Sequence, residues 1–127
     1  MIVVDTSVWV DALRRGDSET ARRLQGLLDA DEVALPLPVR IELLSGVSAR
    51  DRPALERALS ALPVIRPTDD SWAVIERWTT AAARAGQRFG LTDLLIAALA
   101  DEIGGLVWST DRDFERLAEA KIVRLYA

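Results

Sequence analysis

Short apolar runs alternate along the chain with longer stretches in which apolar residues recur at helical spacing. The apolar runs are only a few residues long and rich in β-branched side chains, which is typical of buried strands in a parallel sheet. The run at 63–67 lies between two prolines and is therefore expected at an edge of the sheet. The pattern predicts strands at 2–4, 32–36, 63–67, 106–109 and 122–126.

The amphipathic stretches between these runs predict helices. Residues 92–105 are apolar on almost every side, which predicts a helix buried at the centre of the fold. Within the helix at 68–86, one face is expected to carry Trp72, Ile75, Trp78 and Thr79. Residues suited to cap a helix stand at several of the starts, namely Thr6 or Ser7, Ser18, Thr92 and Thr110. The predicted helices run through 9–13 and over 16–31, 38–47, 52–62, 68–86, 92–105 and 111–120.

Regular alternation of short strands and helices favours one fold class. It predicts an α/β domain with a central, mainly parallel sheet and helices on both faces. A chain of 127 residues has room for one hydrophobic core, so a single domain is expected over 1–127.

The composition restricts the chemistry of any active site. The chain contains neither cysteine nor histidine, which excludes thiolate chemistry, the commonest general base and the commonest zinc ligand. Carboxylates, hydroxyls, arginines and backbone groups remain. The net charge of −4 gives no overall attraction for nucleic acid. No signal-peptide pattern precedes Asp5, and no segment approaches the roughly 18 apolar residues of a membrane span, so a cytoplasmic protein without membrane association is expected.

Two aspartates follow predicted strands. Asp5 ends the run 2–4, and Asp111 comes shortly after the run 106–109. Ligands of open parallel sheets bind beyond the carboxyl ends of the strands, which favours a functional role. Each aspartate is equally explained as a helix cap; at the second position, Thr110 can cap while Asp113 reaches back to it.

Two more carboxylates lie on helix faces expected to be buried. Glu42 shares a face with Leu43, and Asp93 shares one with Ile96. An ionised carboxylate on such a face costs on the order of several kcal/mol unless it is paired. Arg40 points about 200° away from Glu42 around the helix, so it is a poor partner. At Asp93, the helix dipole explains the charge but not its position on the buried side.

All four carboxylates can meet at one edge of the sheet, where their mutual repulsion requires a cation. An all-oxygen site of this kind selects Mg²⁺, with Mn²⁺ as the alternative, over zinc. Such ions activate water and hold phosphate, so a phosphodiester substrate is expected. The four predicted ligands are Asp5, Glu42, Asp93 and Asp111.

The motifs that carry these acids resemble those of the PIN domain, and most of all the VapC-type toxin ribonucleases of bacterial toxin–antitoxin pairs. The resemblance extends over essentially the whole chain and implies a PIN-like three-layer sandwich. The four matching segments are "VVDTSVWVD" with Asp5 and a supporting Ser7, "VRIELLSGV" with Glu42, "LTDLLIAALA" with Asp93, and "STDRDFERL" with Asp111. Many relatives carry proline before the third acid, where this chain has Thr92.

The resemblance implies an Mg²⁺-dependent endoribonuclease toxin that cleaves single-stranded or looped RNA through an activated water. It also implies a homodimer and a neutralising VapB-type antitoxin. Ser7, Thr110 and Asp113 are expected to orient the ligands or water. Candidate RNA contacts are Arg14, Arg15, Arg84 and Arg88, although solvated helix faces explain these arginines as well.

Three alternatives remain open. A PIN nuclease that matures RNA without acting as a toxin has the same sequence features. A receiver domain also gathers acids and Mg²⁺ at strand ends, but it needs a paired acid after its first strand, where this chain has Thr6. A catalytically inactive interaction module is disfavoured because all four acids are present. Four tryptophans are expected in the core or at a subunit interface, with base stacking by the first as a lesser alternative; they are Trp9, Trp72, Trp78 and Trp108.

Overall fold

Four short parallel strands form the sheet at the centre of the fold. The computed structural model describes residues 1–127. The strands are β1 (Ile2–Val4), β2 (Val33–Pro36), β3 (Val64–Ile65) and β4 (Leu106–Trp108), in the spatial order β3-β2-β1-β4. The prediction of a parallel sheet with the run at 63–67 on its edge is confirmed.

The register of β1 and β4 brings two distant parts of the chain to one edge of the sheet. Val4 pairs with Trp108, and the backbone N–H of Asp5 donates to Trp108 O over 2.9 Å. Because the two strands are parallel neighbours, the residues after Val4 and after Trp108 leave the sheet side by side.

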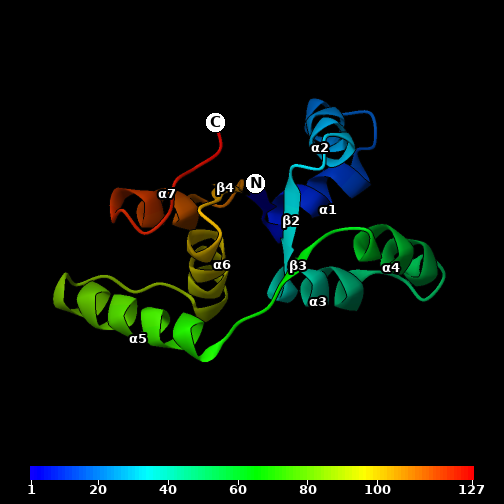
Figure 1. The fold of residues 1–127 in the computed structure, drawn as a ribbon. Helices are drawn as coiled ribbons and strands as arrows, with labels where there is room; N and C mark the ends of the chain where they lie inside the picture. The colour runs from blue at the N-terminus through cyan, green and yellow to red at the C-terminus, as the bar shows by residue number, and fades with distance from the viewer.

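Seven helices surround the sheet. They lie on both of its sides: in Figure 1, α1 and α2 lie on one side, with α5 and α6 on the other. The predicted fold class is therefore confirmed. The helices are α1 (Thr6–Arg14), α2 (Glu19–Asp29), α3 (Leu37–Gly46), α4 (Arg52–Ser60), α5 (Asp69–Arg84), α6 (Leu91–Glu102) and α7 (Arg112–Glu119).

Helix α6 is the central buried helix that its composition predicts. It contacts β2 and β4 on one side and α5 on another, so little of its surface remains for solvent. Ile96 and Leu99 are completely buried, as are Val3, Val4 and Val107 of the sheet. None of the seven helices combines the length and the hydropathy that a membrane-spanning segment requires.

The caps of α1 and α7 differ from the prediction. Asp5, rather than Thr6 or Ser7, is the N-cap of α1, and it makes no side-chain cap bond. Asp111, rather than Thr110, is the N-cap of α7, and its Oδ1 accepts from the backbone N–H of Asp113 over 2.9 Å. The physical reason in α1 is that the Thr6 and Ser7 hydroxyls donate to carboxylates instead.

The predicted N-cap is correct for α2 and wrong for α6. Ser18 caps α2 by accepting from the backbone N–H of Ala21 over 3.1 Å, as predicted. Thr92 does not cap α6, because the helix already begins at Leu91, with Gly90 as its N-cap.

Two further predictions are wrong in part. The segment 122–126 is not a strand but makes a single parallel bridge, between Leu125 and Val107. Val107 is the one residue of β4 whose backbone exchanges hydrogen bonds with the segment, at 2.9 and 2.8 Å. On α5, Ile75 is buried, whereas Trp72 is 42% exposed and Thr79 is exposed. Helix α5 packs on the outside of α6, which leaves it a narrower buried face than the pattern predicts.

Candidate metal centre

Asp5 occupies the carboxyl end of β1 and is buried, with 7% of its surface exposed. Its Oδ2 accepts hydrogen bonds of 2.8 Å from both Ser7 Oγ and Ser109 Oγ. Each hydroxyl has one proton and donates it to this oxygen. Asp5 Oδ1 therefore remains the oxygen that is free to bind a cation.

The same two hydroxyls also position the loop after β4. Ser7 Oγ accepts from the backbone N–H of Thr110 over 3.1 Å, and Ser109 Oγ accepts from that of Asp111 over 3.0 Å. Thr110 therefore contributes to the site through its backbone N–H. Ser109 was not among the predicted site residues, although its place directly after a buried strand that ends near an acid was a usable signal.

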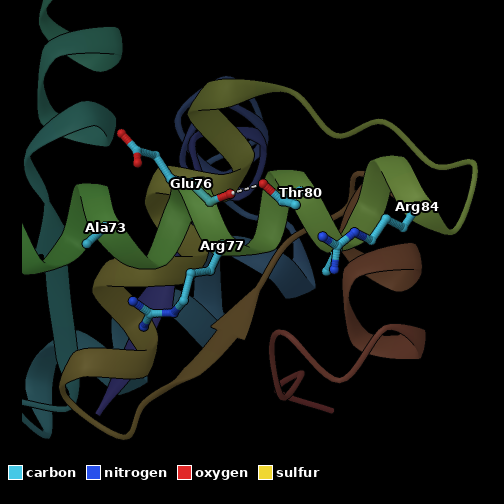
Figure 2. A pocket seen from close by; sticks show the side chains of 6 residues that line it. Ala73, Glu76, Arg77, Thr80 and Arg84 are labelled. Atoms are coloured by element: carbon cyan, nitrogen blue, oxygen red, sulfur yellow. Dashed lines mark hydrogen bonds between the residues drawn. The ribbon is translucent and has the colours of Figure 1, made fainter.

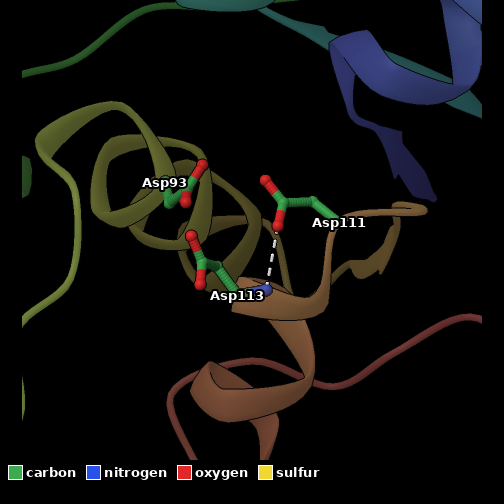
Figure 3. A group of neighbouring side chains, drawn as sticks. All are labelled: Asp93, Asp111 and Asp113. Atoms are coloured by element: carbon green, nitrogen blue, oxygen red, sulfur yellow. Dashed lines mark hydrogen bonds between the residues drawn. The ribbon is translucent and has the colours of Figure 1, made fainter.

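Three aspartates form the tightest acidic group. Asp93 lies in the first turn of α6, whereas Asp111 and Asp113 lie at the start of α7. One carboxylate oxygen from each lies within 4.8 Å of the other two, and Figure 3 shows the three side chains directed toward one another. Asp113, for which the sequence predicts a supporting place, is therefore as central to this group as the two predicted ligands.

The electrostatics of Asp93 connect this group to the other two acids. The pKa of Asp93 is raised from its usual 3.8 to about 6, first by burial and then by the negative charges of Asp111, Asp5, Asp113 and Glu42, in that order. The other four carboxylates are therefore close enough to act on Asp93. Such a cluster is unfavourable without a cation.

Glu42 reaches the same edge from the solvent side. The prediction that it lies on a buried helix face is wrong, because Glu42 is exposed while Val39 and Leu43 of α3 are buried. Thr6 Oγ1 donates to Glu42 Oε1 over 3.0 Å, and Thr6 directly follows Asp5. Glu42 therefore stands at the open rim of the acidic edge, where its charge stays hydrated.

One positively charged side chain contacts the group of three aspartates. Arg116 Nη1 lies 3.2 Å from Asp113 Oδ1, one helical turn away on α7. Arg116 was not among the predicted site residues. Its spacing of three positions from an acid on the same helix was the signal that could have found it.

The donor set fits a hard divalent cation. All of its atoms are carboxylate oxygens, which Mg²⁺ and Mn²⁺ prefer, and no nitrogen or sulfur ligand favours zinc. Two oxygens on opposite sides of an Mg²⁺ ion lie about 4 Å apart, given bond lengths of about 2 Å. The three aspartate oxygens lie within 4.8 Å of one another, which is a separation of the same order.

Comparison with known proteins identifies the family. Residues 2–120 match the model of the PIN domain. The chain belongs to the PIN-domain family. The predicted resemblance is therefore confirmed.

Relatives of this PIN-domain chain include two proteins of Mycobacterium tuberculosis. Ribonuclease VapC11 is 35% identical over 126 residues, which cover 93% of this chain and 92% of the relative. Ribonuclease VapC18 is 37% identical over 120 residues, which cover 91% of this chain and 85% of the relative. These identities extend over nearly the whole PIN domain.

Solved structures share the fold. One is the DNA-bound VapBC from Salmonella typhimurium, with a TM-score of 0.81 and 21% identity over 98% of this chain and 96% of the other. Another is VapBC-5 from Mycobacterium tuberculosis, a member of the VapBC family of toxin–antitoxin systems, with a TM-score of 0.68 and 26% identity over 97% and 94%.

The four candidate RNA-binding arginines of this PIN domain do not converge. Arg14 lines a groove of about 370 Å³ together with Glu42, and Arg88 lines a small hollow of about 160 Å³ with Leu94, next to Asp93. Arg15 instead pairs with Asp11 on its own helix, at 3.5 Å. Only Arg14 therefore shares a hollow with an acid of the cluster.

Arg84 lies on the outer surface of α5. It lines a shallow hollow of about 560 Å³ that is formed by α5 alone and that contains no acid of the cluster. Figure 2 shows Arg84 there with Arg77 and with Thr80, whose hydroxyl donates to Glu76 O over 3.1 Å.

Three of the four tryptophans of this PIN domain contribute to packing, namely Trp9, Trp78 and Trp108, whereas Trp72 is exposed. Trp9 has only 6% of its surface exposed, so its ring is not available to stack on a base, and its Nε1 has no hydrogen-bond partner. Trp108 is buried beside Tyr126, with ring centres 5.6 Å apart.

Proposed function

We propose that this PIN-domain protein is a metal-dependent endoribonuclease and the toxin of a toxin–antitoxin pair. The observation that carries the proposal is the group of carboxylates from α6 and α7 whose oxygens lie within 4.8 Å of one another beside Asp5. The relatives named as VapC ribonucleases support the choice of RNA as substrate, because the similarity extends over 93% of the chain.

The acidic residues would hold one or more divalent cations, Mg²⁺ first and Mn²⁺ as the alternative. Asp93, Asp111 and Asp113 would bind through the oxygens that face one another, and Asp5 through Oδ1. Glu42 would contribute from the rim, directly or through water. A bound cation supplies Lewis acidity toward a phosphate oxygen and lowers the pKa of a water molecule.

The protein's own residues prepare this chemistry. Ser7 and Ser109 fix the orientation of the Asp5 carboxylate by donating to Oδ2, which leaves Oδ1 free for a cation. Asp93, with a pKa of about 6, holds a proton in mildly acidic solution and gives it up when a cation binds. The buried wall of β1 and α6 keeps bulk water from one side of the site, while the exposed Glu42 and Asp111 leave the other side open to a polymer.

The charges around the site define how RNA would bind. The net charge of −4 gives little general attraction for RNA, so contact with the backbone depends on the bound cation and on nearby arginines. Among the four candidates, Arg14 is the one that shares a groove with an acid of the cluster, Glu42. RNA binding is therefore expected to be weak and sensitive to salt.

The proposal includes a partner. The solved VapBC-5 belongs to a family of toxin–antitoxin systems. It is 26% identical to this chain over 97% of this chain's length. A VapB-type antitoxin would neutralise the activity, and the toxin itself would form a homodimer.

Expression in cells tests the proposal. Induction of the parent is expected to arrest growth and to create new RNA ends, whereas the Asp93→Ala variant, produced to the same level, creates none. Sequencing of RNA ends from both cultures provides the readout. Identical RNA ends in the two cultures would contradict the proposed ribonuclease. Cleavage of one precursor without growth arrest would instead favour a role in RNA maturation.

A further inference from the structure

Arg116 joins the two parts of the chain that carry the aspartate group. From α7, its Nη1 donates to Asp113 Oδ1 over 3.2 Å, and its Nη2 donates to the backbone carbonyl of Arg88 over 3.1 Å. Its Cζ also lies 4.7 Å from the centre of the Phe89 ring. One planar guanidinium therefore holds a carboxylate, a carbonyl and an aromatic face at once.

These contacts join α7 to the segment that precedes α6. Arg88 and Phe89 belong to the segment between α5 and α6 that leads directly into the first turn of α6, where Asp93 lies. The hydrogen bond from Arg116 to Arg88 is the one that joins this segment to α7. The negative charges of Asp111 and Asp113 repel that of Asp93, so the two elements need a link that resists their separation.

We propose that Arg116 is a positioning residue, which holds Asp111 and Asp113 against Asp93 so that the carboxylate group is assembled before a cation binds. This inference rests on the proposed metal-dependent function. Pre-assembly matters because a bound cation otherwise has to supply the free energy that brings like charges together.

A simple counter-charge makes the opposite prediction. If Arg116 only neutralised Asp113, its removal would take a positive charge away from the site and would strengthen the binding of a divalent cation. If Arg116 positions the ligands, its removal weakens binding. The direction of the change therefore separates the two roles.

Binding of Mn²⁺ to the metal-free protein tests the inference without an activity assay. Electron paramagnetic resonance of free Mn²⁺ gives the dissociation constant for the parent, for Arg116→Gln and for Arg112→Gln. Arg112 is exposed at the start of the same helix and makes no ion pair or side-chain hydrogen bond, so its substitution removes the same charge without the link. We expect Arg116→Gln to weaken binding by about 10-fold or more, and Arg112→Gln to leave it unchanged or slightly tighter.

The Arg116→Lys variant refines the test and protects it against misfolding of the glutamine variant. Lysine keeps the charge and can reach Asp113, but it lacks the planar fork that also holds the Arg88 carbonyl. Its affinity for Mn²⁺ is expected between those of the parent and Arg116→Gln, with circular dichroism confirming the fold. Unchanged or tighter binding in Arg116→Gln, or full recovery by lysine, would overturn the inference. Failure of the parent to bind Mn²⁺ would instead overturn the proposed function.

Discussion

Ser109 Oγ donates a 2.8 Å hydrogen bond to Asp5 Oδ2, joining residues that are 104 positions apart in the sequence. The bond exists because β1 and β4 are parallel neighbours whose last residues, Val4 and Trp108, are in register. This bond fixes the buried carboxylate of Asp5. The same hydroxyl oxygen accepts a hydrogen bond from the backbone N–H of Asp111 and so holds the loop that carries Asp111. The acidic edge is therefore a direct consequence of the sheet topology.

Replacement of Ser109 by alanine tests this relationship. The variant loses one donor to Asp5 and one acceptor for the Asp111 N–H, so both carboxylates become less ordered. We expect RNA cleavage in Mg²⁺ to fall by about 10- to 100-fold. The free energy of unfolding should fall by only about 1 to 3 kcal/mol, as two hydrogen bonds imply. Ser60→Ala, which removes a hydroxyl bonded to Glu56 O at the end of α4, is the control and should cleave like the parent.

The raised pKa of Asp93 predicts how cation binding depends on pH. A cation must displace the proton from Asp93, whose pKa is about 6 in the folded protein. The affinity for Mn²⁺ should therefore rise by up to about 10-fold per pH unit below pH 6 and level off above it. Titrations of metal-free protein between pH 5 and pH 8 provide the measurement. A flat profile would show that Asp93 does not release a proton to the site.

The raised pKa of Asp93 also predicts how the free energy of unfolding depends on pH when no metal is bound. Between its usual pKa of 3.8 and the folded value of about 6, Asp93 is protonated in the native state and ionised in the unfolded chain. The native state therefore binds more protons in this window, so the contribution of Asp93 to stability declines as pH rises and is lost above pH 6. Chemical denaturation in chelator at a series of pH values can measure this.

The Asp93→Asn variant isolates that contribution. Its free energy of unfolding, relative to the parent, should increase from pH 4 to pH 6 and remain constant above pH 6, because asparagine does not titrate. A difference that is independent of pH would contradict the assignment of the raised pKa to Asp93.

The central position of α6 predicts unequal effects of two substitutions on one helix. Ile96 is completely buried against the core, whereas Leu91 is 61% exposed. Ile96→Ala should reduce the free energy of unfolding by about 2 to 5 kcal/mol, because it removes buried methyl groups and leaves a cavity. Leu91→Ala should change it by about 0.5 kcal/mol or less. Equal losses in urea denaturation would contradict the observed orientation of α6.

The sequence predicted the parallel sheet and the central helix because each has a strong local signal. Buried parallel strands are continuous apolar runs, and α6 is apolar on nearly every side because it lies between the sheet and α5. The single bridge at Leu125 shows the limit of that signal, since an apolar run does not determine how many of its residues pair. The predicted caps of α1 and α7 failed because neighbouring polar residues compete for each helix start and tertiary contacts decide among them. The cap at Thr92 failed because α6 begins one residue earlier, after Gly90.

The acidic edge was predictable as a whole, but its internal arrangement was not. Strand ends and helix faces pointed to Asp5 and Asp93, whereas helical periodicity placed Glu42 on a buried face when it lies on the exposed rim. The contribution of Ser109 depends on the register between β1 and β4, and that of Arg116 depends on the path of the segment before α6. Neither relationship is local in sequence.

The central claim is that carboxylates from β1, α6 and α7 form one site that cleaves RNA with a divalent cation. The most direct measurement is cleavage of a single-stranded RNA by purified protein in chelator and after addition of Mg²⁺ or Mn²⁺, for the parent and for Asp93→Asn. The account predicts no cleavage by the parent in chelator, cleavage after the cation is added, and none by the variant under either condition. Full activity of the parent in chelator, or equal cleavage by Asp93→Asn, would contradict it.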